Sequence, residues 1–131
     1  SSKELNGSFE AYNKDGIVIE FHFCVLAGRK GVCRILAVIK NTSETDVESF
    51  SLMLFGPQWR VTAESANGTR LEAQGGNSIE QCFEITNMAK AGNTGAIAIG
   101  MKFSYDSTTT SKHTTVETSV NLPDSFMRIV A

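Results

Sequence analysis

Apolar and polar residues alternate one by one along much of this 131-residue sequence, and this alternation constrains the fold more than any other feature. The pattern is clearest in residues 17–25, where the odd positions hold Ile, Ile, Phe, Phe and Val. Successive side chains of a β-strand point to opposite faces of a sheet, so the spacing predicts a strand with its odd positions in the core. Apolar residues nowhere recur at helical spacing over three turns. The chain is therefore expected to be all-β.

The same alternation predicts about eight strands separated by turns. Residues 13–16 (NKDG) are typical of a hairpin turn, because Gly16 accepts a positive φ. Residues 32–40 are almost all apolar, which favours a central strand covered on both faces. The only short helical turn is expected at residues 124–130. The spacing of about ten residues per strand indicates an immunoglobulin-like antiparallel β-sandwich. The residues expected in its core are Phe21, Phe23, Ile35, Leu52, Ile85, Ile99 and Phe103.

Composition narrows the function classes. The length fits one domain, with residues 1–7 expected to be a linker or cloning remnant and residues 8–131 the domain. A net charge of −2 argues against nucleic-acid binding, and no apolar run approaches the 18 residues of a membrane span. The three cysteines show no ligand spacing and no signal peptide opens the chain, so we expect free thiols in the cytosol.

Catalytic signals are weak. His22 lies mid-strand on the more polar face and is expected to face solvent or to form a hydrogen bond. His113 ends a Ser/Thr loop, with no patterned carboxylate or nucleophile near it. No hydrolase, metalloprotease or phosphate-binding motif occurs. We therefore expect neither an enzyme nor a cofactor or metal site.

The outward faces of two strands form a candidate binding surface. If Phe50, Leu52 and Leu54 point inward, Met53 and Phe55 point outward. On the strand 96–105, the face opposite the apolar stripe carries Ala98, Gly100, Lys102 and Ser104. Small residues beside apolar ones would leave a trough suited to an aromatic peptide anchor. Two other interpretations stay open: a loop covers Met53 and Phe55, or the two strands are not neighbours.

Several ordered motifs resemble the ear, or appendage, domain of gamma-adaptins and GGA proteins. Residues 8–21 (SFEAYNKDGIVIEF) look like its first hairpin. Residues 79–87 (IEQCFEITN) resemble its Ile-x-Gln strand, and 102–105 (KFSY) its Lys-apolar-Thr-Tyr ending. Asn41-Thr-Ser-Glu44 with Phe50 and Pro57, and residues 121–126 (NLPDSF), are similar to two further segments. Each motif is weak alone, but together they span the domain in the family's order.

This resemblance implies a non-catalytic β-sandwich that hangs from an N-terminal hinge of a clathrin adaptor at the trans-Golgi network and endosomes. Such ears recruit accessory proteins to coated vesicles by binding short acidic peptides with an aromatic anchor. The matched site positions are Phe55, Pro57, Ala63, Ala98, Gly100 and Lys102, and the isolated domain is expected to be a monomer.

The sequence departs from the family at this site. Gln58 stands where the family commonly has Lys, Ala98 and Gly100 where it has basic residues, and Phe55 where it has a small one. Lys102 remains, with Arg60 and Arg70 as candidate substitutes. The alternatives are an immunoglobulin-like structural module and the sandwich part of an alpha-type appendage.

Overall fold

The computed structural model describes residues 6–25, 31–88 and 98–123 of the chain. Eight strands and a short 3-10 helix follow one another in this part, and every strand pairing in it is antiparallel. The bounds are β1 Asn6–Lys14, β2 Ile17–Val25, β3 Val32–Asn41, β4 Val47–Phe55, β5 Trp59–Ala63, η1 Ala73–Gly75, β6 Ser78–Asn87, β7 Ala98–Ser107 and β8 His113–Asn121. The expected helical turn at residues 124–130 lies outside the described residues.

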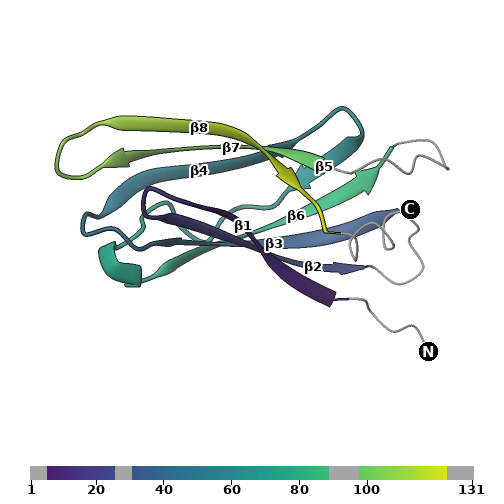
Figure 1. Cartoon of the computed structure of the whole chain (residues 1–131), viewed down its shortest axis with the longest axis horizontal. Helices are drawn as coiled ribbons and strands as arrows, with labels where there is room; N and C mark the ends of the chain where they lie inside the picture. Colours follow the sequence, from purple (N-terminus) through teal and green to yellow (C-terminus); the bar gives the residue numbers. More distant parts are fainter. Residues whose placement is uncertain (1–5, 26–30, 89–97, 124–131) are drawn as a thin grey trace.

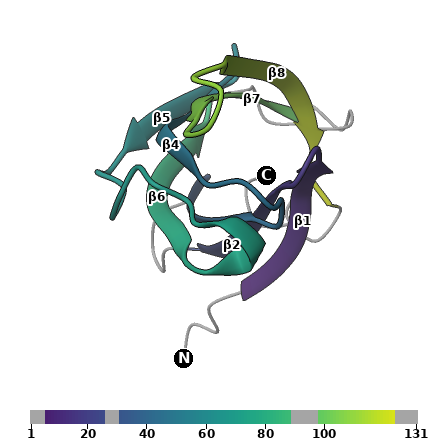
Figure 2. The ribbon, with the colours of Figure 1, turned by 90° about the vertical axis from the view of Figure 1, so that its left-hand side faces the viewer.

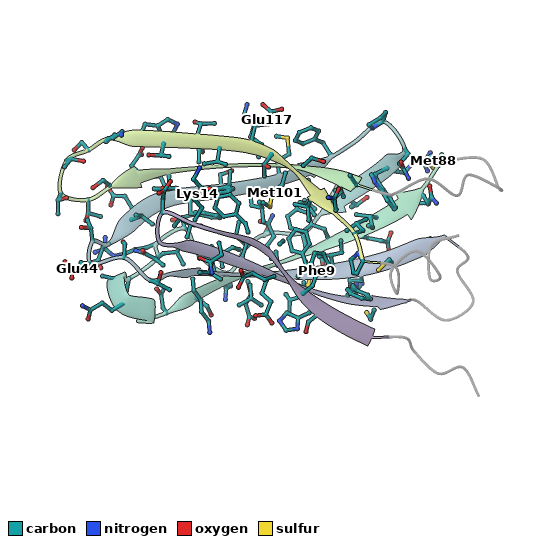
Figure 3. All side chains as sticks on the ribbon, in the orientation of Figure 1. Phe9, Lys14, Glu44, Met88, Met101 and Glu117 are labelled. Carbon is teal, nitrogen blue, oxygen red and sulfur yellow. The ribbon has the colours of Figure 1, made fainter. Side chains whose placement is uncertain are left out.

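The strands form two packed sheets, which appear as two layers in Figure 1 and end-on in Figure 2. The five-stranded sheet has the order β1-β2-β3-β6-β5, and the three-stranded sheet has the order β4-β7-β8. Figure 3 shows Met101 of β7 between the layers and Glu117 of β8 on the outer side. The expected β-sandwich is confirmed.

The core lies between the two sheets, where the alternation predicted it. The seven predicted core residues are at most 7% exposed: Phe21, Phe23, Ile35, Leu52, Ile85, Ile99 and Phe103. An aromatic group joins the layers, because the ring of Phe103 lies 5.7 Å from Phe50 and 5.0 Å from Tyr12 of β1. The period of two therefore predicted the inward position of these seven residues correctly.

Local chemistry fixes two of the connections. The β1–β2 hairpin turns through Asp15 and Gly16, with φ of 53° and 84°, which confirms the expected turn and fits a type I′ geometry. At the end of β3, the Nδ2 amide of the buried Asn41 side chain donates to the carbonyl oxygens of Thr45 at 2.8 Å and Leu71 at 3.4 Å. Its Oδ1 accepts the backbone N–H of Ser43 at 3.0 Å. These bonds hold the corner from which β4 starts.

The structure corrects one expectation for β3. This strand is central in its sheet, but only its inward face is covered: Cys33, Ile35, Ala37 and Ile39 are buried, whereas Arg34 and Lys40 are exposed. Leu36 and Val38 on the outward face are half-buried. The prediction of two covered faces was wrong, because a two-layer sandwich covers each sheet from one side only.

Candidate peptide-binding surface

Strands β4 and β7 are direct neighbours, so the residues proposed from alternation lie on one outer sheet face. Met53 of β4 is in register with Lys102 of β7, and Phe55 is in register with Gly100. Met53 is 57% exposed, one of two large exposed apolar side chains in the described part of the chain. We call the outward side of the three-stranded sheet the β4–β7–β8 face.

The trough expected above Gly100 is filled by the chain itself. A methyl group at Gly100 would overlap the ring of Phe55, because the ring lies directly on the glycine backbone. Phe55 is half-buried for this reason. Covering a strand glycine with a cross-strand aromatic ring stabilises a sheet. At Gly100 the expected trough is therefore absent, and the ring of Phe55 forms the surface there.

The charge on this face is more balanced than the sequence suggested. Lys102 is in register with Glu117 of β8 on its other side, and Gly100 is in register with Ser119. Glu117 lies on the outer side of β8 in Figure 3. Sequence reasoning did not name these β8 residues, although their alternation with the buried Val120 was a usable signal. An opposite charge beside Lys102 weakens its attraction for an anionic ligand.

Pro57 and Ala98 lie where β4 turns into β5. The backbone N–H of Trp59 donates to the Gly56 carbonyl oxygen at 3.1 Å, which closes the turn containing the exposed Pro57. The indole Nε1 of Trp59 donates to the carbonyl oxygen of Ala98 at 3.1 Å. This bond connects β5 of one sheet to β7 of the other, so it fixes the end of the β4–β7–β8 face.

The remaining proposed residues lie elsewhere. Arg60 and Ala63 belong to β5, which pairs with β6 in the five-stranded sheet, and their side chains alternate to opposite faces of that strand. Arg60 is therefore not brought beside Lys102. Arg70 does not substitute for a missing cation either, because it is held by Asp46 at 2.8 Å and Glu48 at 3.7 Å near the start of β4.

A comparison with protein families assigns the chain. The family described as "Adaptin C-terminal domain" matches residues 7–123. The chain belongs to the adaptin C-terminal domain family.

Solved structures agree with this adaptin C-terminal domain in fold. The GAE domain of GGA2p from Saccharomyces cerevisiae has a TM-score of 0.71 at 18% identity, covering 89% of this chain and 98% of that one. The yeast GGA1 GAE domain has a TM-score of 0.69 at 17% identity, covering 89% of this chain and 99% of that one. No curated protein sequence matches the chain. The resemblance to the adaptor ears is thus confirmed.

Family membership also settles the question of catalysis, since adaptin ear domains are not enzymes. The structure nevertheless corrects the description of His113. The β7–β8 hairpin brings the carboxylate of Asp106 to 2.6 Å from Nδ1 and the hydroxyl of Thr115 to 3.2 Å from Nε2. These side chains lie on the exterior, with 61% of the His113 side chain exposed. In this adaptin domain they brace the hairpin.

The expectations for His22 and for the three cysteines agree with the structure. His22 faces solvent, as predicted. Its Nε2 lies 2.8 Å from the Glu20 carboxylate. Cys24, Cys33 and Cys82 are free thiols. Within the described ranges, no three His, Cys, Asp or Glu side chains are grouped to hold a metal ion. In the same ranges, no helix has the length and apolarity that a bilayer crossing requires.

Proposed function

We propose that this adaptin C-terminal domain recruits accessory proteins to clathrin-coated carriers by binding short Phe-containing acidic peptides on its β4–β7–β8 face. It would act in the cytoplasm at trans-Golgi and endosomal membranes, attached through an N-terminal hinge to its adaptor. The proposal rests mainly on the exposed Met53, which lies beside the Phe55 ring and is in register with Lys102. An exposed apolar patch with polar neighbours is typical of a protein-interaction surface.

Apolar contact would supply most of the affinity at this surface. One exposed cation contributes only about 0.2–1 kcal/mol to an ion pair. Glu117 reduces even this attraction, because it is the cross-strand neighbour of Lys102. An aromatic anchor of the peptide would pack on the Phe55 ring and the Met53 side chain. Truncating either residue would therefore remove more contact than truncating Lys102. We therefore expect modest affinity with a weak dependence on salt.

The test titrates a fluorescent peptide with one Phe and several acidic residues against wild type and three variants. Met53→Ser and Phe55→Ser should each weaken binding about tenfold, as for residues that contribute more than 1 kcal/mol. Lys102→Ala should weaken it less than about fivefold. Raising the salt concentration tenfold, which shortens the Debye length from about 10 Å to about 3 Å, should leave binding detectable.

Lys40→Ala is the matched control, because Lys40 is an exposed strand lysine on the other sheet. It removes the same charge and should leave the affinity unchanged. Met53→Ser distinguishes lost binding from lost folding. Met53 is exposed, so its substitution should leave the fold intact, whereas Phe55 packs on Gly100. If high salt abolishes binding while both apolar variants bind like wild type, a charged site elsewhere carries the function.

A further inference from the structure

The outward face of the five-stranded sheet carries a hollow that the proposed adaptor surface does not use. Its volume is about 580 Å³, and its lining includes Leu36, Cys24 and Cys82. A second hollow of about 210 Å³ adjoins it and shares Leu36 and Cys82. Together they form one groove, which we call the β3 groove. It runs along β3, whose outward apolar residues are not covered by a further layer.

The two ends of the β3 groove carry opposite charges. Arg34 and His22 line the larger hollow, and Glu64 and Glu80 line the smaller one. His22 is already engaged by Glu20. Arg34 is in register with Cys24 of β2 and with Glu84 of β6. Arg34 is exposed, so its guanidinium forms the basic end of the groove, with Glu84 as a cross-strand neighbour.

The floor between these ends is apolar. Leu36 and the Cys24 and Cys82 side chains are half-buried there. Burial, followed by the nearby Glu64 carboxylate, raises the pKa of the Cys82 thiol. A protonated thiol behaves as a small apolar group. The floor therefore suits an aliphatic side chain and offers no activated nucleophile.

The geometry points to a peptide ligand. We propose that the β3 groove binds an extended segment of a partner protein with an acidic residue, an aliphatic residue and a basic residue at positions i, i+2 and i+4. Arg34, Leu36 and Val38 follow one another at the same spacing, and Glu80 is in register with Val38. Alternate residues of an extended chain share a face and rise about 6.6 Å per pair, so their side chains match these three positions.

The groove lies on the sheet opposite Met53 and Phe55, so the two proposals are independent. The probes are the capped peptides Asp-Thr-Leu-Thr-Lys and Lys-Thr-Leu-Thr-Asp, titrated into the ¹⁵N-labelled domain and followed by amide chemical shifts. Both orders are needed because the groove accepts either chain direction. At least one peptide should shift the amides of Arg34, Leu36 and Cys82, and leave Met53 and Lys102 unchanged. The peptide with Ser in place of Leu should shift none of them.

Two variants and a matched control test the assignment. Arg34→Glu should weaken binding about five- to tenfold, since it replaces an attraction by a repulsion. Leu36→Ser should weaken it similarly through the lost apolar contact. Lys40→Glu makes the same charge change on the same strand, at an exposed position beyond the groove lining, and should have less than half the effect.

Alkylation provides a second measurement. Bound peptide should slow the reaction of Cys82 with iodoacetamide, whereas the fully buried Cys33 serves as an unreactive internal reference. The proposal is overturned if neither peptide shifts the groove amides, or if Arg34→Glu and Lys40→Glu weaken binding equally. It is also overturned if the amides shift with protein concentration alone, which would assign this face to a second copy of the chain. Loss of binding in Met53→Ser would place the peptide on the other sheet.

Discussion

At the scale of single residues, the three thiols differ through their surroundings. Cys33 points into the core and is fully buried, whereas Cys24 and Cys82 line the β3 groove. Burial raises the pKa of the Cys33 thiol to about 12 from its usual 9.0. The sequence predicted three free thiols, and the structure shows that Cys33 is fully buried whereas the other two are half-buried.

The Cys33 thiol should make stability depend on alkaline pH. Its proton is retained to about pH 12 in the folded protein, but is lost near pH 9.0 in the unfolded chain. Between these values the unfolded state binds fewer protons, so the free energy of unfolding falls as pH rises, by at most about 1.4 kcal/mol per pH unit for one group.

Cys33→Ala removes this contribution. Urea denaturation from pH 8 to 11 measures the free energy of unfolding of wild type and variant. The difference between the two should change only above pH 9, where the variant loses stability less steeply than the wild type. The other titrating groups are common to both proteins and cancel. Parallel curves over this range would contradict the buried, protonated thiol.

At the scale of elements, a bulge and the pairing with β7 determine the position of β4. The register shifts between Glu48 and Ser51, and Ser49 has a φ of 56°. Val47 and Phe50 are consequently both buried although their spacing breaks the alternation. This explains why the alternation becomes visible only from Phe50, three residues after β4 begins. An interrupted period hides a strand start from pattern reasoning.

The contact between β4 and β7 can be tested directly. An aromatic ring on the Gly100 backbone should shift the Gly100 Hα resonances upfield, and Phe55→Ser should return them to ordinary values. Gly100→Ala should displace the ring and increase the exposure of Phe55. Ser119→Ala, in register with Gly100 on β8 and exposed, is the control that should leave Phe55 in place. Ordinary Gly100 shifts in the wild type would mean that the ring lies elsewhere.

At the scale of the whole molecule, aromatic packing joins the two sheets. Phe103 of β7 stacks on Phe50 of β4 and meets the edge of Tyr12 of β1, at an interplanar angle of 78°. Phe103 is 1% exposed, so its ring fills space between both layers. Loss of this ring would affect both sheets at once.

Phe103→Ala should therefore lower the free energy of unfolding by about 3–5 kcal/mol, the range for a large buried aromatic side chain. Chemical denaturation with urea measures this loss. Val116→Ala on the neighbouring β8 is a control, because the Val116 side chain is only half-buried and in register with Phe103. A Phe103→Ala protein within about 1 kcal/mol of the wild type would show that the ring is not part of the core.

The candidate surface was predictable only in part. Alternation placed Met53, Phe55 and Lys102 on outward faces without any knowledge of their neighbours. It did not reveal that β4 and β7 are adjacent, that Phe55 covers Gly100, or that Glu117 stands beside Lys102. It also did not reveal that Arg60, a candidate substitute cation, lies on β5 in the other sheet.

By itself, the sequence determined which segments are strands and which side of each strand is buried. Both properties depend on the local order of apolar and polar residues. Only the tertiary structure decided which strands lie side by side, and with them the surface around Phe55, the Asp106–His113 contact and the opposite charges of the β3 groove. The reason is physical: burial side is encoded within one strand, whereas register and pairing depend on packing between segments far apart in the chain.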